Sequence, residues 1–263
     1  MKKRLLEGKT GLVMGLANNK SLAWGIAKTA FSNGAKLAIS YQDDIFLKRV
    51  QPLAKELDDA PLVKCDVNNR NSMDETFSWL KEKFKKIDFL VHAIAFSDRD
   101  ELKGRCIDTS RANFLNTMDV SCYSFIEIAR RAAEIMNPNG SILTLSYYGS
   151  QKVIPNYNVM GIAKAALETS VKYCAADLGV NGIRVNAISA GPIKTLAASG
   201  IGEFRTMLNF NRENSPLQKN VDIYDIGNSA LYLLSDLSNG VTGEIHFVDA
   251  GYNILGSPKK IAL

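Results

Sequence analysis

Short apolar runs alternate with longer amphipathic stretches along the whole chain, and this alternation constrains the fold more than any other feature of the sequence. Each run is rich in Val, Ile and Leu, which is typical of strands that are buried on both faces of a parallel sheet. The runs are Gly11–Leu16, Lys36–Ser40, Leu62–Cys65, Asp88–Ala93, Ser141–Ser146, Arg184–Ile188 and Glu244–Val248.

The stretches between these runs have helical periodicity. They lie near residues 21–33, 44–58, 70–86, 109–136, 157–179 and 222–236. Strands and helices that alternate in this way form a parallel sheet with right-handed crossovers. We therefore predict an α/β fold with a single Rossmann-like, doubly wound parallel sheet of about seven strands and helices on both faces. Ligands of such sheets bind beyond the carboxyl ends of the strands.

Nothing in the sequence divides the chain into separate domains. It has 263 residues, no internal repeat and no linker rich in Pro, Gly or Ser, so we expect one domain over residues 1–263.

The region from Gly191 to Gln218 interrupts the alternation with a long connection. Connections of this length inside a compact domain are usually functional. We therefore expect a substrate-covering loop near residues 192–218, and an ordinary surface excursion is the alternative.

Composition and charge exclude several classes of protein. Hydrophobic residues make up 46% of the chain and charged residues 22%, which is typical of a globular protein and not of a disordered one. The 32 Lys and Arg and the 27 Asp and Glu give a net charge of +5, which is spread along the chain. We interpret the one dense basic run, Lys81–Lys86, as the solvated end of a helix and not as a nucleic-acid-binding patch.

The cysteine and histidine patterns indicate no metal site. The four cysteines form no CxxC motif, and His92 and His246 stand alone, so we expect free thiols in a reducing cytoplasm.

Leu5 and Leu6 are followed directly by Glu7, which leaves no apolar stretch for a signal peptide. No run approaches the ~18 apolar residues of a membrane-spanning helix.

The first predicted strand, turn and helix have the features of a phosphate-binding segment. Gly15 lies at the strand end, where the absence of a side chain lets the backbone approach a phosphate. The next helix begins near Ser21, and its free N–H groups and positive dipole attract anions. Gly25, one turn into this helix, permits close packing of the helix on the strand. Because the spacing is not GxGxxG, a simple tight turn is the alternative for this segment alone.

The ends of the second and third predicted strands fit a dinucleotide. The second strand ends at Gln42-Asp43-Asp44, where the ribose of an adenosine would lie. Acidic groups without an adjacent Lys or Arg repel a 2′-phosphate, so this end favours NADH over NADPH. The third strand ends at Asp66, which is placed to pair with an adenine amino group. A helix N-cap is the alternative role of Asp66.

The segment around Lys164 carries a resemblance to a known family. Gly161-Ile162-Ala163-Lys164 is similar to the lysine half of the active-site motif of short-chain dehydrogenases. Met160 stands at the usual tyrosine position, four residues before the lysine, and Tyr157 lies one turn earlier. This Tyr-x6-Lys arrangement resembles the divergent enoyl-acyl-carrier-protein reductases, the NADH-dependent branch of type II fatty acid synthesis. The resemblance extends over nearly the whole chain, and it includes Cys65-Asp66-Val67 and residues 188–197.

The resemblance implies a set of contacts with NADH/NAD. The implied residues are Gly15, Ser21, Leu22, Gln42, Asp66, Val67, Ile94, Lys164, Ile193, Lys194, Thr195, Leu196 and Ala197. It also implies that the backbone at Ser97 contacts the substrate, that the loop after Pro192 orders over the ligand, and that the protein is a cytoplasmic homotetramer.

The implied reaction delivers a hydride to the β carbon of an α,β-unsaturated thioester and leaves negative charge on the carbonyl oxygen. A tyrosine hydroxyl is a suitable neutral donor to that oxygen, and we assign this role to Tyr157. Lys164 lies on the same helical face about 10 Å farther along, which suits it to hold the nicotinamide ribose. We predict catalytic roles for Tyr147, Tyr157 and Lys164, and substrate contacts for Ser97, Tyr157 and Met160.

Three functions remain open from the sequence. We expect the chain to reduce trans-2-enoyl-acyl-carrier-protein with NADH, in the last step of each fatty acid elongation cycle. A carbonyl-reducing short-chain dehydrogenase acting on 3-oxoacyl thioesters would share the fold and cofactor but requires a tyrosine where Met160 stands. A non-catalytic dinucleotide-binding regulator would bind the cofactor without turnover. We expect the acyl carrier protein as partner, no nucleic acid and no membrane insertion.

Overall fold

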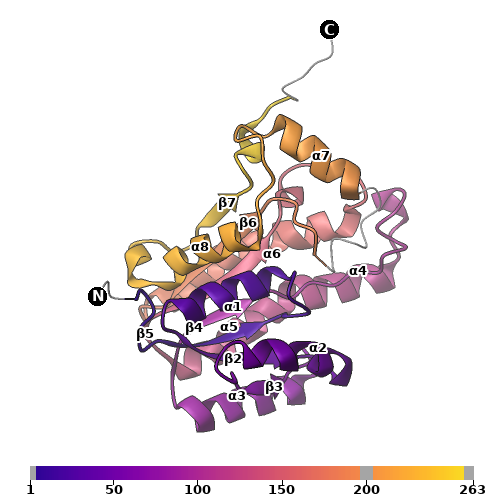
Figure 1. Ribbon diagram of the computed structural model, residues 1–263. Helices are drawn as coiled ribbons and strands as arrows, with labels where there is room; N and C mark the ends of the chain where they lie inside the picture. The colour runs from indigo at the N-terminus through magenta and orange to yellow at the C-terminus, as the bar shows by residue number, and fades with distance from the viewer. Residues whose placement is uncertain (1–3, 196–203, 258–263) are drawn as a thin grey trace.

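The sheet has the predicted parallel architecture (Figure 1). The computed structural model describes residues 4–195 and 204–257. Its seven strands lie in the order β3-β2-β1-β4-β5-β6-β7, and each neighbouring pair is parallel. They are β1 (Thr10–Met14), β2 (Lys36–Tyr41), β3 (Leu62–Lys64), β4 (Ile87–His92), β5 (Met136–Ser146), β6 (Arg184–Ala190) and β7 (Ile245–Val248). The strand order reverses between β1 and β4, and doubly wound sheets bind ligands at such a switch point.

Helices cover both faces of the sheet, as predicted (Figure 1). The helices of the described residues are α1 (Leu22–Ser32), α2 (Asp44–Lys55), α3 (Arg70–Phe84), α4 (Arg111–Met118), α5 (Ser124–Ile135), α6 (Asn158–Gly179), α7 (Phe204–Asn214) and α8 (Ile223–Leu234). One core, which includes Trp24 and Leu233, lies between the sheet and α1, α2 and α8. The other, which includes Phe125 and Leu167, lies under α3, α5 and α6. Within residues 4–195 and 204–257, none of these helices has the length and apolarity needed to cross a bilayer.

The predicted helix over residues 109–136 is divided. A π-helical turn, Asp119–Tyr123, separates α4 from α5. Such turns inside α-helices are frequently found at functional sites. Val120, Ser121 and Cys122 of this turn are buried, so the irregular segment faces the interior of the protein.

Helix α7 occupies part of the region near 192–218 in which we expected a loop. Its buried positions are the polar residues Asn211 and Asn214, so the short apolar stripe of Phe204, Met207 and Leu208 is not continued by an apolar residue at position 211. The amide of Asn211 instead donates to Asn220 Oδ1 at 3.2 Å, and the Asn220 amide donates to the Leu208 carbonyl at 3.1 Å. Polar contacts fix this helix, and the sequence pattern therefore does not reveal it.

Gly25 lies where α1 approaches α8, and not against a strand as we predicted. A Cβ on Gly25 would lie 2.0 Å from the Ile223 carbonyl oxygen. On the facing helix, a Cβ on Gly227 would lie 2.6 Å from the Gly25 carbonyl oxygen. The two helices therefore meet backbone to backbone, because α1 and α8 share one face of the sheet.

The close approach at Gly25 makes its substitution costly. We expect Gly25→Ala to lower the free energy of unfolding by about 1–3 kcal/mol, because the added methyl group overpacks a contact with rigid backbone. The control is Gly179→Ala at the end of α6, where an added Cβ meets nothing within 4 Å; we expect a change within about 0.5 kcal/mol there. Urea unfolding of both variants measures the difference, and equal stabilities would contradict the contact.

Candidate functional site

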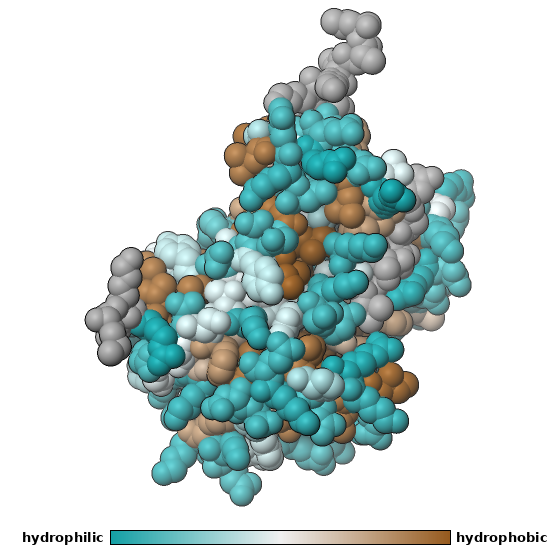
Figure 2. Space-filling model, viewed as in Figure 1, coloured by the Kyte–Doolittle hydropathy of each residue, from teal (hydrophilic) through white to brown (hydrophobic). Residues whose placement is uncertain are grey.

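A cavity of about 660 Å³ lies at the carboxyl ends of the strands. It is lined by the segments that follow β1, β2, β3, β4, β5 and β6 and by helices α6 and α7. On the face drawn in Figure 2, apolar side chains gather in the recess between α7 and α1. The volume lies in the range of small-molecule and cofactor sites, and the position is the one expected for the ligand of a doubly wound sheet.

The turn after β1 brings backbone to the cavity without an intervening side chain. Gly15 has φ +85°, and a Cβ there would lie 2.0 Å from the Ala93 carbonyl oxygen at the end of β4. Ser21, at the N-cap position of α1, donates its hydroxyl to the Asn18 carbonyl at 2.5 Å and makes no side-chain cap bond. Ser21 and Leu22 line the cavity, so the positive end of α1 faces a possible phosphate.

The ends of β2 and β3 form one end of the site. Gln42, Val67 and Asn68 line the main cavity, whereas Asp66 lines an adjacent polar pocket that it shares with Gln42. Asp66 lies 3.5 Å from the Gln42 amide nitrogen and accepts from the Asn68 N–H at 3.1 Å. Asn69, and not Asp66, is the N-cap of α3, so the structure does not support the alternative cap role of Asp66.

The adjacent polar pocket holds one cation and several carboxylates. Lys64 lies there with Asp43, Asp66 and Glu75. Lys64 was not predicted from the sequence, because we expected the strand to continue to Cys65; in the structure β3 ends at Lys64, which pairs with Tyr41 of β2. The three carboxylates outnumber the lysine, so the pocket still disfavours an added phosphate group.

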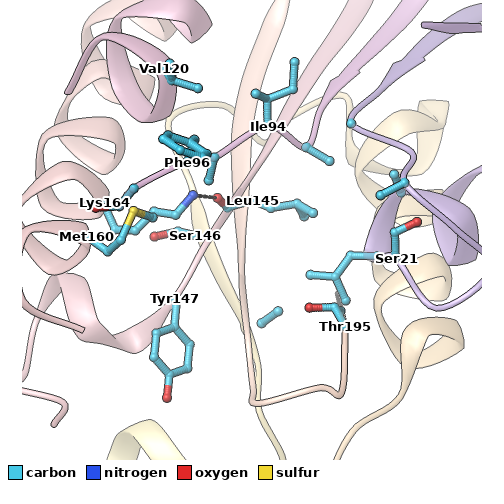
Figure 3. A pocket seen from close by; sticks show the side chains of 18 of the residues that line it. Ser21, Ile94, Phe96, Val120, Leu145, Ser146, Tyr147, Met160, Lys164 and Thr195 are labelled. Atoms are coloured by element: carbon cyan, nitrogen blue, oxygen red, sulfur yellow. Dashed lines mark hydrogen bonds between the residues drawn. The ribbon is translucent and has the colours of Figure 1, made fainter. Parts of the chain in front are cut away.

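Lys164 is a buried cation at the centre of the site. Its side chain comes from α6, is 6% exposed and donates to the Leu145 carbonyl oxygen at 2.7 Å (Figure 3). Burial lowers the pKa of Lys164 from 10.5 to about 8. In Figure 3, Lys164 and Met160 lie on the opposite side of the cavity from Ser21 and Thr195. The cavity therefore separates the ammonium group from the amino end of α1.

Tyr147 and Tyr157 lie together beside Lys164. Their ring centroids are 5.0 Å apart in an edge-to-face arrangement. Burial raises the pKa of both phenols above the usual value, so both hydroxyls keep their protons and remain donors at neutral pH. The Tyr147 hydroxyl lies 3.4 Å from the Met207 sulfur of α7. Tyr157 directly precedes α6 and lines the same cavity as Met160 and Lys164.

The tyrosines open onto an apolar chamber. Phe96, Leu102, Val120, Phe204 and Met207 contribute to its wall. Such a lining suits a hydrocarbon chain.

Ser97 is anchored by its own polar neighbours. Its side chain is 8% exposed and lies 3.3 Å from Asn113 Oδ1, and it accepts from the Thr117 hydroxyl at 2.9 Å. Ser97 lines the cavity. Its hydroxyl is therefore engaged within the protein.

The structure brings most of the predicted site residues together. The ones that line the cavity are Gly15, Ser21, Leu22, Gln42, Val67, Ile94, Ser97, Tyr147, Tyr157, Met160, Lys164, Ile193 and Thr195. Asp66 and Lys194 are not among the lining residues, and Leu196 and Ala197 lie outside the described residues.

Three of the lining residues that were not predicted from the sequence come from segments whose structure the sequence pattern did not reveal. Phe204 and Met207 come from the unpredicted helix α7, and Arg99 from an irregular loop. His92 is fully buried between Ser124 and Thr144, and burial lowers its pKa to about 3, so it stays neutral. In the described part of the chain, no cluster of His, Cys, Asp and Glu could hold a metal ion.

Comparisons with known proteins agree on one family. Residues 15–253 match the family model described as enoyl-(acyl carrier protein) reductase. An enoyl-[acyl-carrier-protein] reductase [NADH] of Rhizobium meliloti is 62% identical over 96% of this chain and 93% of its own length. The Rickettsia typhi enzyme of that name is 55% identical over 99% of this chain and 100% of its own length.

A solved structure agrees as well. The enoyl-(acyl-carrier-protein) reductase of Anaplasma phagocytophilum, crystallised in complex with NAD, superimposes with a TM-score of 0.94 at 55% identity, and covers 97% of this chain and 98% of its own. Together with the family match, these likenesses show that the chain belongs to the enoyl-(acyl carrier protein) reductase family.

Proposed function

We propose that this protein reduces the carbon–carbon double bond of trans-2-enoyl-acyl-carrier-protein with NADH, the last step of each fatty acid elongation cycle. One observation carries the proposal: a single cavity joins the glycine turn of β1 to an apolar chamber that holds Tyr157 and Lys164. Family membership and the names of the close relatives support it. Met160 stands where carbonyl-reducing relatives need a tyrosine, so we do not propose ketone reduction.

The residues around the cavity fit NADH. The turn at Gly15 leaves backbone open toward the amino end of α1, which suits a pyrophosphate. Contacts would come from Gly15, Ser21, Leu22, Gln42, Val67, Ile94, Lys164, Ile193 and Thr195. The proposal also includes Asp66, Lys194, Leu196 and Ala197, which the family resemblance implies. When bound, the cofactor supplies a hydride to the β carbon of the substrate.

Tyr157 stabilises the charge that the hydride creates. As the β carbon gains the hydride, the thioester carbonyl oxygen becomes an enolate, and a fixed donor lowers the energy of that state. The buried, protonated hydroxyl of Tyr157 is such a donor. Tyr147, whose ring packs on that of Tyr157, orients it and limits access of water. Ser97 and Met160 contact the acyl thioester.

Lys164 acts on the ribose side of the site. Its ammonium group is held at the Leu145 carbonyl, and its remaining donors suit the ribose hydroxyls of the nicotinamide half. Its positive charge also favours the enolate that forms beside Tyr157.

The partner and the assembly belong to the same proposal. The substrate arrives on the acyl carrier protein, and residues 192–218 cover it, with Phe204 and Met207 of α7 supporting this role because they line the chamber. The protein works as a homotetramer in the cytoplasm. Exposed apolar side chains on α4 and α5, such as Leu115 and Ile126, agree with an assembly through these helices.

The proposed reaction is tested by mixing the protein with an enoyl thioester and NADH and following the loss of nicotinamide absorbance. We expect turnover with NADH, and a kcat/KM for NADPH at least about tenfold lower, because a 2′-phosphate would meet the carboxylates beside Gln42 and lose ~1.4 kcal/mol or more. No oxidation of NADH would refute the function, and a preference for NADPH would refute the cofactor assignment. A 3-oxoacyl thioester as substrate is the control for the carbonyl-reducing alternative.

Replacement of the proposed donor separates chemistry from cofactor binding. We expect Tyr157→Phe to lower kcat about 100- to 1000-fold, because loss of one donor to a developing oxyanion has that effect. The dissociation constant of NADH should change little. Tyr173→Phe, an exposed tyrosine of the same helix, is the matched control and should retain activity. Unchanged turnover in Tyr157→Phe would remove this residue from the mechanism.

The lowered pKa of Lys164 predicts a pH dependence of cofactor binding. The ammonium form predominates below pH about 8, so NADH should bind more weakly as the pH rises through that value. Lys164→Met should bind NADH weakly at all pH values and lose this dependence. Fluorescence titrations with NADH between pH 6.5 and 9.5 measure both. The same slope in the wild type and in Lys164→Met would assign the titration to another group.

A further inference from the structure

Glu168 is a buried carboxylate that the proposed reaction does not use. It lies on α6, one turn beyond Lys164, and is 7% exposed. Its Oε1 atom accepts hydrogen bonds from the hydroxyls of Ser146 at 2.5 Å and Ser150 at 2.6 Å. These lengths are typical of a hydroxyl that donates to a carboxylate. A buried charge is costly in free energy without such partners, so the hydrogen bonds from both serines stabilise the buried carboxylate.

The two serines bracket the turn that carries Tyr147. Ser146 is the last residue of β5, and Ser150 ends the short 3-10 helix Tyr148–Ser150. One carboxylate oxygen therefore holds both ends of the five-residue segment Ser146–Ser150, which we name the tyrosine turn. Within the segment, the Ser150 N–H also donates to the Tyr147 carbonyl at 2.9 Å, and the shared carboxylate adds a side-chain link between the two ends.

Close packing ties the tyrosine turn to α6 and to Tyr157. A Cβ on Gly149 would lie 2.5 Å from the ring of Tyr157, and one on Gly161 would lie 2.7 Å from the Gly149 carbonyl oxygen. The turn thus supports the back of the Tyr157 ring. A small displacement of the turn would move Tyr147 and Tyr157 together, since their rings are also in contact.

The same segment begins next to the partner of Lys164. Leu145, whose carbonyl oxygen accepts a hydrogen bond from the Lys164 ammonium group, directly precedes Ser146. Two side chains of helix α6 therefore hydrogen-bond to consecutive residues at the end of β5: Lys164 to Leu145 and Glu168 to Ser146. Glu168 also accepts from Ser150 at the other end of the turn.

We propose that Glu168 is a positioning residue, which clamps the tyrosine turn against α6 and thereby sets the positions of Tyr147 and Tyr157 for reduction of the enoyl thioester. The inference rests on the proposed function, because it concerns the same site. Glu168 touches neither of the two tyrosines in the contacts described above and acts through Ser146 and Ser150.

Two substitutions separate the hydrogen bonds from the charge. Glu168→Gln keeps a carbonyl oxygen at the Oε1 position, which can accept from both serines, and removes the charge. Glu168→Met has a similar length and offers no comparable acceptor. We expect Glu168→Met to lower kcat about 10- to 100-fold, because a misplacement of about 1 Å at reacting groups costs up to about 100-fold. Glu168→Gln should retain kcat within about threefold. Ser150→Ala removes one of the two donors, and its kcat should lie between those of Glu168→Met and Glu168→Gln.

The pH dependence of NADH binding measures the effect of the Glu168 charge separately from that of its hydrogen bonds. The titratable groups around Lys164 in the described residues include Glu168 on its own helix, Cys122 on the π-helical turn, His92 on β4, and Tyr147 and Tyr157 in the same cavity. Glu168 raises the pKa of Lys164 against the larger effect of burial. Both Glu168→Gln and Glu168→Met should therefore move the loss of NADH binding to lower pH, although only Glu168→Met loses turnover. General destabilisation would not produce this pattern.

Hydrogen exchange tests the clamp without relying on activity. The Ser150 and Gln151 amides donate to the carbonyls of Tyr147 and Tyr148 at 2.9 and 3.0 Å. These amides should exchange faster in Glu168→Met and at the wild-type rate in Glu168→Gln. Ser170→Ala on the same helix is the control and should change neither kcat nor this exchange. The Ser170 hydroxyl donates to the Ala166 carbonyl at 2.8 Å and lies 3.6 Å from the Cys122 sulfur, and neither of these partners belongs to the tyrosine turn.

The outcomes distinguish the two proposals. If the wild type fails to reduce an enoyl thioester, the function is wrong, and the exchange experiment still decides whether Glu168 clamps the turn. If the wild type is active and Glu168→Met has normal kcat and normal exchange, the clamp is refuted. Equal losses of kcat in Glu168→Gln and Glu168→Met would also refute it, because charge and not hydrogen bonding would then be responsible. If Glu168→Met does not fold, Ser150→Ala must show the partial loss of kcat and faster exchange.

Discussion

Parallel strands place all their carboxyl ends at one edge of the sheet, and the functional site depends on this constraint. The glycine turn follows β1, Gln42 follows β2, Ile94 follows β4 and Tyr147 follows β5, so residues that are far apart in sequence meet around one cavity. The reversal of strand order between β1 and β4 opens the cavity at that edge. Helix α6 then crosses beside β5 and adds Lys164 from the side.

Burial gives the groups in this cavity their chemical character. Lys164 would be fully charged well above neutral pH if it were exposed, and burial brings its pKa to about 8. The phenols of Tyr147 and Tyr157 respond in the opposite sense, because burial disfavours the charged form of every group and their charged form is the phenolate. One physical effect therefore keeps the tyrosines as donors and makes the lysine sensitive to pH. The fixed carbonyl of Leu145 offsets part of the cost of the buried cation.

The sequence was informative where a pattern is local and less informative where contacts are distant. The seven strands and most helices follow from the periodicity of apolar residues, which registers directly which faces are buried. Helix α7 escaped prediction because Asn211 and Asn214, and not apolar residues, occupy its buried positions. Gly25 was recognised as a packing position, but its partner α8 lies about 200 residues away in sequence, so the nature of the contact required the fold. The same applies to Lys64 and to the phenol–thioether contact between Tyr147 and Met207.

The sequence by itself determined where most strands and helices lie along the chain, where the glycine turn lies, and the Tyr-x6-Lys spacing. Each of these features depends on residues that are close to each other in the sequence. These patterns also carry the family resemblance, and most of the site residues that the resemblance implies line the cavity. Only the tertiary structure decided that Glu168 accepts from Ser146 and Ser150, that Asp66 lies in a pocket beside the main cavity, and that α7 contributes Phe204 and Met207 to the apolar chamber. The physical reason is that side-chain hydrogen bonds and packing join elements whose separation in space no local pattern encodes.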